Sequence, residues 1–206
     1  MKVNVEVTTD SRFGTNSYLV EDEETHDAVV IDANLEPDHM VELVRDRGAK
    51  VKAILLTHTD LDHIAGIHEL REAFGEVPVV VHESERFVLT EGKPLRREFG
   101  PIATKLEGIS TFGDTYRAGS LEFEVLHTPG HSPGGVTLKI DGCLFTGDAL
   151  FAGTVGRSDF ANSDGKALLE GIHKKLLSQP DGAVVYSGHG PTTTIGRERQ
   201  LNPFLT

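Results

Sequence analysis

The sequence predicts an α/β protein whose first half alternates strands with helices and whose second half begins with several strands in succession. Short apolar runs of strand length, such as VKAILL, alternate with segments in which apolar residues recur at helical spacing. From Tyr116 onward, alternating segments such as LEFEVLHT and a DG turn indicate neighbouring strands. With 38% hydrophobic and 25% charged residues the composition is that of a globular protein. We expect one domain spanning residues 1–206.

The first half is expected to begin with a sheet. Residues 2–8 and 16–21 are predicted to pair as strands, and 28–33 to form a third strand. An amphipathic helix is predicted to start at Pro37 and to end at Gly48. The elements expected next are a strand at 51–56, a helix at 63–74, a strand at 77–82 and a helix beginning near 83.

The second half is expected to contribute a second group of strands. Residues 92–113 lack periodicity and contain two prolines, so we predict a long surface loop near a substrate entrance. The elements predicted after it are strands at 121–128, 135–141 and 143–149, a glycine-rich loop at 151–160, a helix at 167–177, a strand at 183–189 and a short tail.

The charge excludes some classes of partner. The formal net charge is -12, with 32 acidic and 20 basic residues, which would repel a nucleic-acid backbone or an anionic membrane surface. The first ten residues alternate like a strand and contain no apolar core of a signal peptide, so we expect a cytoplasmic protein. Cys143 is the only cysteine, so an internal disulfide is impossible, and we interpret this residue as a packing residue.

One segment, THTDLDHIAG at 57–66, concentrates potential metal ligands. It follows an apolar strand and precedes a helical pattern, and such connections often carry chemistry. Within six residues it holds four nitrogen or oxygen donors suited to a divalent cation. These are His58, Asp60, Asp62 and His63.

Three further candidates lie at strand ends beside turn residues. His131 is in HTPGHSPGG, Asp148 in LFTGDALF and His189 in VVYSGHG. Loops at strand ends are where an α/β scaffold presents reactive side chains. The seven donors, in four loops, suffice for two metal ions with about four protein ligands each, or three and a water.

These motifs, in this order, resemble the metallo-β-lactamase superfamily, whose pattern is T-H-x-H-x-D-H followed by TPGH, GD and GH. The segments TPGHSPG, FTGDALFAGTVGRSDF and SGHGPTTTIGRERQLNPF resemble the glyoxalase II (hydroxyacylglutathione hydrolase) branch, particularly its short bacterial members. The resemblance implies an αββα sandwich, in which two mixed sheets pack face to face with helices outside and the active site lies at one edge.

The resemblance also implies residue roles. The implied first metal site takes His58, the residue at position 60 and His131. The implied second site takes Asp62, His63 and His189, and Asp148 bridges the two. Asp62 and Asp148 are then the catalytic carboxylates. Arg157 could simply be a loop residue, but the resemblance makes it a candidate anchor for a substrate carboxylate.

The sequence departs from the family pattern at Asp60, which stands where the family has a histidine. A carboxylate adds negative charge, prefers harder ions and reaches less far than an imidazole. We therefore expect fewer than two zinc ions, or a preference for iron or manganese.

The resemblance implies a hydrolase with one or two divalent metal ions, zinc being expected and iron or manganese the alternatives. A metal-bound hydroxide would cleave a small-molecule thioester such as S-(2-hydroxyacyl)glutathione. Full-size glyoxalase II enzymes carry an added C-terminal helical region that helps hold glutathione, and this chain ends soon after GHGP, so the thiol carrier is left open.

Two other functions remain open at this point. A mononuclear-iron persulfide dioxygenase would use His58, His131 and Asp148 as a two-histidine, one-carboxylate set. A metal-binding or interaction module without turnover would leave so complete a ligand set unexplained.

Overall fold

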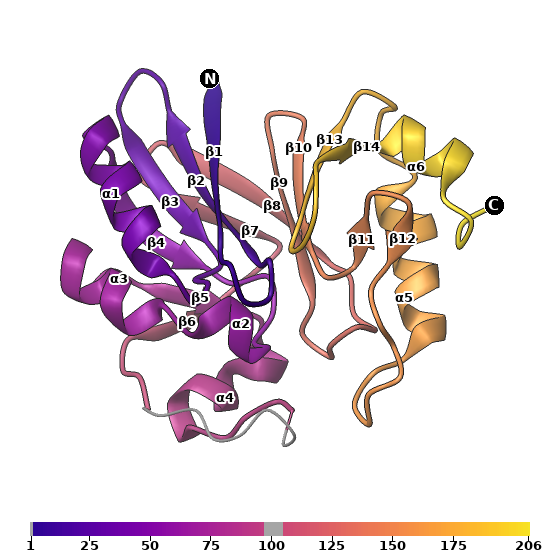
Figure 1. Cartoon of the computed structure of the whole chain (residues 1–206), viewed down its shortest axis with the longest axis horizontal. Coiled ribbons are helices and arrows are strands. Elements are labelled where there is room, and N and C mark those ends of the chain that lie inside the picture. Colours follow the sequence, from indigo (N-terminus) through magenta and orange to yellow (C-terminus); the bar gives the residue numbers. More distant parts are fainter. Residues whose placement is uncertain (1, 97–104) are drawn as a thin grey trace.

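The molecule is built from two mixed β-sheets that lie face to face, with helices on both outer faces (Figure 1). The computed structural model describes residues 2–96 and 105–206. Within these ranges each large sheet has six strands. The αββα sandwich that the resemblance implied is therefore confirmed.

The first sheet has the strand order β1-β2-β3-β4-β5-β6. Its strands are β1 (Val3–Thr9), β2 (Asn16–Asp22), β3 (Asp27–Ile31), β4 (Lys50–Leu55), β5 (Val79–Val81) and β6 (Ile109–Thr111). The first three strands pair antiparallel, and β3 to β6 run parallel. Every residue of β2 is buried, because this strand is covered on both faces.

The helices α1 (Pro37–Arg47) and α3 (Ile67–Phe74) pack beside each other on this sheet. Pro37 begins α1, where its fixed φ suits the first helical turn, and Gly48 ends it with a φ of 65°. The helix predicted at 63–74 is instead two helices, α2 (Leu61–Ile64) and α3. Gly66 separates them where the backbone passes the carbonyl oxygen of Asn34, which a Cβ would approach to 2.5 Å.

The second sheet has the strand order β14-β13-β10-β9-β8-β7. Its strands are β7 (Thr115–Ala118), β8 (Leu121–His127), β9 (Val136–Ile140), β10 (Cys143–Gly147), β13 (Val184–Ser187) and β14 (Thr193–Thr194). All neighbours are antiparallel except β10 and β13, which are parallel. A separate hairpin of β11 (Leu150–Phe151) and β12 (Thr154–Val155) occupies part of the predicted glycine-rich loop.

Helices α5 (Gly165–Gly171) and α6 (Ile195–Leu201), with the π-helical segment η3 (Ile172–Leu176), cover the second sheet. The Asp164 side chain caps α5 by accepting from Ala167 N, and the Thr194 side chain caps α6 by accepting from Arg197 N. The expected short tail is thus an ordered helix, because buried Ile195 anchors its first turn against the second sheet.

Hydrophobic packing follows the layers of the sandwich. A central cluster between the sheets includes Tyr18, Leu55, Phe123 and Phe145. One outer cluster lies between the first sheet and its helices, and another lies between the second sheet and its helices. The loops that carry the candidate ligands follow β4, β8, β10 and β13, and they meet at one edge of the sandwich.

The prediction of a surface loop at 92–113 is wrong in part. Residues Ile109–Thr111 form β6, and Arg96 is buried to 3% exposure. Residues 97–104 of that prediction lie outside the described residues. After α4 (Arg86–Glu91), which continues the short 3-10 turn η1 (Glu83–Glu85), the chain turns inward at Arg96 toward the site.

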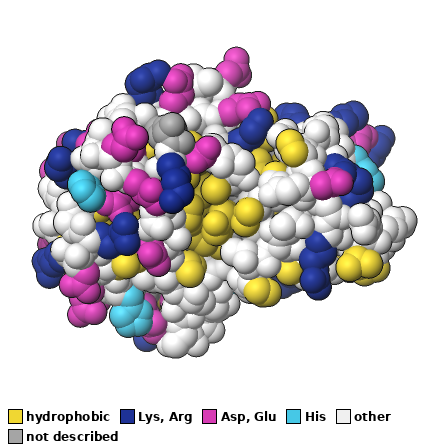
Figure 2. All heavy atoms as spheres, turned by 90° about the horizontal axis from the view of Figure 1, so that it is seen from above, with side chains coloured by type: hydrophobic (Ala, Val, Ile, Leu, Met, Phe, Trp, Pro, Cys, Tyr) yellow, Lys and Arg dark blue, Asp and Glu magenta, His cyan; other side chains and the backbone are white. Residues whose placement is uncertain are grey.

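On the face seen in Figure 2, acidic and basic side chains are interspersed and hydrophobic side chains gather near the middle. Among the described residues, no helix is both long enough and apolar enough to cross a membrane.

Candidate metal centre

The segment that follows β4 positions four of the seven candidate ligands. β4 ends at Leu55, and α2 begins at Leu61, so the intervening turn brings His58 and Asp60 to the end of the first sheet. The first turn of α2 then carries Asp62 and His63. The tight spacing of the motif reflects this short connection between a buried strand and a helix.

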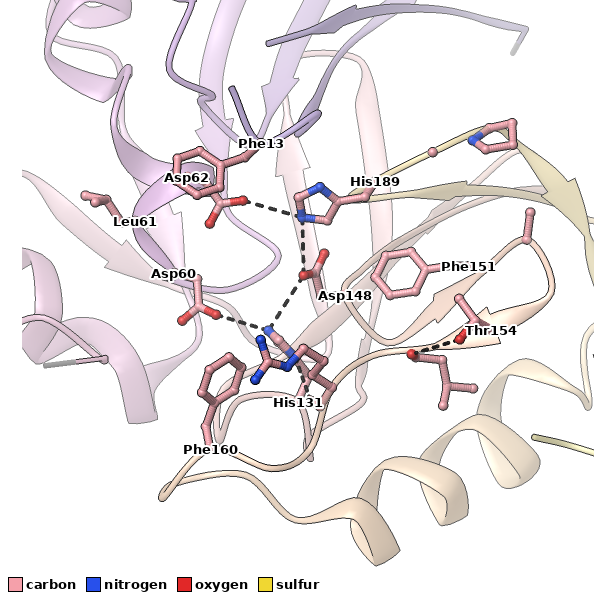
Figure 3. Close-up of a pocket in the computed structure, with 15 residues that line it drawn as sticks. Phe13, Asp60, Leu61, Asp62, His131, Asp148, Phe151, Thr154, Phe160 and His189 are labelled. Carbon is pink, nitrogen blue, oxygen red and sulfur yellow. Dashed lines mark hydrogen bonds and ion pairs between the residues drawn. The ribbon is translucent and has the colours of Figure 1, made fainter. Parts of the chain in front are cut away.

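The other three candidates come from separate strand ends of the second sheet. His131 lies in the loop between β8 and β9, Asp148 directly follows β10, and His189 follows β13. An isolated bridge between Thr15 and His189 ties this last loop to the residue that precedes β2. Figure 3 shows side chains from these loops pointing toward one another.

Six of the seven side chains converge in two sets. Ligand atoms of His58, His131 and Asp148 lie within 4.8 Å of one another, as do those of Asp62, His63 and His189. We call the places that these sets surround the first and the second metal position. Asp60 adjoins the first, with Oδ2 3.1 Å from His131 Nε2 and 3.8 Å from His58 Nε2.

Asp148 lies between the two positions. Its Oδ1 is 3.4 Å from His63 Nε2, and its Oδ2 is 3.7 Å from His131 Nε2 and 3.4 Å from His189 Nε2. One carboxylate therefore faces ligands of both sets, which is the placement that a bridging ligand needs.

The donor atoms themselves fit a divalent cation. His58 Nε2, His63 Nε2 and Asp148 Oδ1 are buried and have no hydrogen-bond partner within the described part of the chain. Leaving buried polar atoms unpaired is costly, and three such atoms in one cluster call for an explanation. Neutral imidazoles and carboxylates are ligands of zinc, iron and manganese, so a bound cation would satisfy all three atoms.

Hydrogen bonds on the far side of each ring aim the histidines. His63 Nδ1 donates to Asp32 Oδ2 at 2.8 Å, and the same carboxylate accepts from the amide and hydroxyl of Thr57. His58 Nδ1 donates to Thr57 Oγ1 at 3.1 Å. Each bond uses Nδ1 and leaves Nε2 facing the site, which is how proteins orient imidazole ligands.

His131 is oriented in the same way by a different segment. Its Nδ1 donates to the backbone oxygen of Arg157 at 2.8 Å. The loop after β12 therefore helps to fix a ligand that comes from the loop after β8. This contact gives Arg157 a backbone role in addition to any role of its guanidinium.

Glu85 is a further residue that the sequence analysis missed. It is fully buried, and its carboxylate accepts from the amide and hydroxyl of Thr59 and from the amide of Gly134. It thereby joins the His58–Asp60 turn to the His131 loop. Nothing in ESERFVL distinguishes Glu85 from its neighbours, because its role depends on contacts 26 and 49 residues away.

Arg96 was missed as well. Its Nε donates to both oxygens of Asp60, at 2.9 and 3.1 Å, and its Nη2 donates to the backbone oxygen of His131 at 2.8 Å. Its guanidinium also lies 4.0 Å from the ring centre of Phe160. The residue lies between Pro94 and Pro101 in a segment without periodicity, so no sequence signal could have located it.

The electrostatics keep the carboxylates ionised. Burial alone would raise the pKa of Asp60, but its hydrogen bond to His131 and the charge of Arg96 lower that pKa to about 2. Burial likewise opposes ionisation of Asp62 and Asp148, yet the neighbouring histidines hold the pKa of both well below the usual value. Ionised oxygen donors are therefore present over the whole physiological pH range.

A cavity of about 570 Å³ opens directly above the two metal positions. Asp60, Asp62, His131, Asp148 and His189 form part of its floor. Its walls are mainly apolar and include Phe13, Phe151 and Phe160 (Figure 3). The guanidinium of Arg157 lies at the wall, pairs with Asp159 at 2.8 to 2.9 Å and stacks on Phe160 at 4.5 Å.

Comparison with known proteins agrees with this geometry. Residues 10–189 match the metallo-β-lactamase superfamily. The chain is 33% identical to hydroxyacylglutathione hydrolase GloC of Haemophilus influenzae, with 98% of each chain covered.

Three solved structures share the whole fold. The BLEG-1 B3 metallo-β-lactamase superposes with a TM-score of 0.90 at 35% identity, covering 98% of this chain and 100% of its own. TTHA1623, in a di-iron-bound form, gives 0.85 at 37% identity with the same coverage. ETHE1 from Myxococcus xanthus gives 0.80 at 29% identity, covering 97% of this chain and 83% of its own.

Two sets of buried imidazoles and carboxylates meet around one shared carboxylate, at the edge of an αββα sandwich. Together with the match over residues 10–189, this shows that the chain belongs to the metallo-β-lactamase superfamily, whose fold binds one or two divalent metal ions and whose members are mostly hydrolases.

Proposed function

We propose that this protein is a metal-dependent hydrolase that cleaves a small-molecule thioester such as S-(2-hydroxyacyl)glutathione. The observation that carries the proposal is the pair of ligand sets around Asp148 at the floor of a largely apolar cavity. The 33% identity to a hydroxyacylglutathione hydrolase over 98% of the chain supports the choice of a thioester.

His58, His131 and Asp148 would hold one ion, and Asp62, His63 and His189 the other, with Asp148 shared. Bound divalent ions would lower the pKa of a water molecule and polarise the thioester carbonyl. No nucleophilic side chain is then required. Glu85 and Asp32 keep the two ligand-bearing loops and the imidazole rings in place, so little reorganisation is needed when substrate arrives.

Asp62 has a specific part in this arrangement. Its Oδ2 accepts from Thr15 Oγ1 at 2.6 Å and lies 3.4 Å from His189 Nε2. Because its pKa is held far below neutrality, it stays ionised and serves as an oxygen donor at the cavity floor, and it is too weak a base to store a proton. Asp148 is held ionised in the same way.

The cavity walls favour a substrate with an apolar part. Phe13, Phe151 and Phe160 can contact an acyl chain or the carbon skeleton of a thiol. Arg157 could bind a substrate carboxylate, but the carboxylate would have to compete with Asp159, which already pairs with the guanidinium. We therefore assign Arg157 a modest contribution to binding.

The second candidate function is a mononuclear-iron persulfide dioxygenase. Two observations favour it: the first metal position is a two-histidine, one-carboxylate set, and the ETHE1 structure from Myxococcus xanthus shares the fold at 29% identity. Such a set holds iron and leaves coordination positions open for substrate and oxygen.

A single set of measurements on the purified protein separates these functions. We expect metal analysis to find bound divalent ions and S-D-lactoylglutathione to release its thiol without oxygen uptake. Oxygen consumption with glutathione persulfide, and no thiol release from any acyl thioester, would refute hydrolysis in favour of the dioxygenase. Hydrolysis of a chromogenic cephalosporin alone would instead point to the activity named for the BLEG-1 structure.

A further inference from the structure

The ion pair between Asp60 and Arg96 has no counterpart in the ligand pattern of the family, which has a histidine at position 60. We propose that these two residues act as one neutral unit beside the first metal position, in which Asp60 is the counter-ion of Arg96 and not a metal ligand. His58, His131 and Asp148 alone would then hold the first ion.

The contacts of Arg96 leave its guanidinium little freedom. Nε donates to both carboxylate oxygens of Asp60, and Nη2 donates to the backbone oxygen of His131. Nη1 donates to Asn162 Oδ1 and to Ser163 Oγ. With the side chain only 2% exposed, the guanidinium is fixed by three segments that converge on the site.

Because Arg96 is buried, its guanidinium needs a carboxylate beside it. A guanidinium removed from water is costly unless an opposite charge accompanies it. Asp60, itself 8% exposed in its side chain, supplies that charge through both oxygens. Its contacts with Arg96 and with His131 Nε2 thus explain its position without any metal ion.

Charge counting explains how the site tolerates the departure from histidine. Asp60 contributes one negative charge and Arg96 one positive charge, so together they are as neutral as an unprotonated imidazole. The sequence alone predicts added negative charge beside the metals. The structure places a guanidinium against that charge and cancels it.

The same geometry makes the two residues act oppositely on a bound cation. Arg96 Nη2 lies 3.5 Å from His131 Nε2, so a cation on that nitrogen would have a positive neighbour, whose charge is offset by its ion-pair partner Asp60. Removing the carboxylate should weaken binding at the first position, and removing the guanidinium should strengthen it. Removing both restores a neutral pair.

The test is Zn²⁺ titration of the full-length, metal-free chain in competition with a chromophoric chelator, which gives the dissociation constants for both positions. We expect Asp60→Asn to raise the larger of the two Zn²⁺ dissociation constants by about 10- to 100-fold. This is the usual range for residues that contact a metal ligand but not the metal itself. Arg96→Gln should lower the same dissociation constant, and the double variant Asp60→Asn/Arg96→Gln should return it to the parent value. Arg117→Gln, which removes an exposed guanidinium paired with Glu122, is the control and should change neither constant.

If the double variant binds Zn²⁺ as weakly as Asp60→Asn alone, Asp60 is a direct ligand and the proposal is overturned. A weaker Zn²⁺ affinity in Arg96→Gln would also overturn the proposal, because that result is expected if the guanidinium only supports the structure. Should Asp60→Asn fail to fold, Arg96→Gln and the double variant still decide between these outcomes.

A histidine at position 60 sharpens the test. Asp60→His supplies the family ligand but leaves Arg96 without its counter-ion, so we expect no gain in bound zinc. Asp60→His/Arg96→Gln removes the uncompensated charge and should bind zinc at both positions. A single variant that already binds two zinc ions as tightly as the double variant would contradict the coupling.

This inference rests on the metal binding of the proposed function and on no particular substrate. A protein that shows these changes in Zn²⁺ affinity but releases no thiol from any thioester would refute the proposed hydrolysis and leave the role of Arg96 intact.

Discussion

The two metal positions differ in how the chain encloses them. At the first position, His58 and His131 are buried to 2% and 7% exposure, and the Asp60–Arg96 pair closes one side. At the second, Asp62 and His189 reach the cavity with side chains 18% and 30% exposed. The ligands of the second position are therefore the more exposed, although both positions border the cavity. The first position is more deeply embedded, among groups that fix its charge and shape.

One segment, 57–66, thus contributes ligands to two metal positions that differ in burial. Substitutions at the shared carboxylate should affect both positions, substitutions in the loops should affect one, and substitutions at the cavity wall should affect neither.

The largest effect is expected at Asp148, the side chain that both positions share. Asp148→Ala should abolish turnover and reduce the bound metal, because no other described carboxylate lies between the two sets. Metal analysis and thiol release on the same preparation check this. Unchanged activity from protein freed of metal would exclude the proposed centre.

A substitution at Gly188 should disturb the same region by steric collision. A Cβ there would collide with Asp148 Oδ1 and lie 2.8 Å from Cε1 of His63, so Gly188→Ala should displace both ligands. We expect most of the metal and activity to be lost with only a modest change in far-UV circular dichroism. Gly190→Ala is not a suitable control, because the φ of Gly190 is 75°. Gly182, with open space around it and an ordinary φ, is the matched site.

His189→Ala should distinguish the positions. It removes a ligand from the second set and leaves the first set complete, so bound Zn²⁺ should fall by one equivalent at most. Turnover should fall sharply, because His189 lines the cavity that would hold the substrate. Equal loss from both positions would show that the sets do not fill independently.

Glu85→Gln should act on the first position from outside it. A glutamine amide accepts only at its oxygen, and its nitrogen only donates, so the bonds to Thr59 or to Gly134 are lost. We expect the unfolding free energy to fall by about 1.5 to 3 kcal/mol. Chemical denaturation measures this fall, and Zn²⁺ affinity should drop with it at the first position. Glu83→Gln, an exposed neighbour, is the control and should change neither quantity.

The smallest effect is expected at the cavity wall. Arg157→Gln removes a fully exposed pair with Asp159, so stability should hardly change. If the guanidinium binds a substrate carboxylate, KM should rise by up to about tenfold while kcat and metal content stay constant. A fall in kcat with unchanged KM would mean that the loop acts on His131 through the Arg157 backbone instead.

Much of the fold could be predicted because its elements have local signals. Pro37 and Gly48 delimit α1 by their fixed or permissive backbone angles, and the alternation of 121–128 reports one buried face of β8. The divided helix at Gly66 and the helix α6 were mispredicted. The break at Gly66 depends on the approach of Asn34, and α6 depends on burial of Ile195, and neither contact is local.

The candidate ligands were named by the sequence alone because a metal centre needs a few residue types at fixed spacings next to turns. The resemblance implied how these ligands group. The tertiary structure brings the groups together, since His131, Asp148 and His189 meet the 57–63 segment only after two sheets have packed. It alone also decided what surrounds them. Glu85 and Arg96 act through single long-range contacts with no periodicity or motif, because a buried charge is placed by the partner it finds in space and not by its neighbours in the chain.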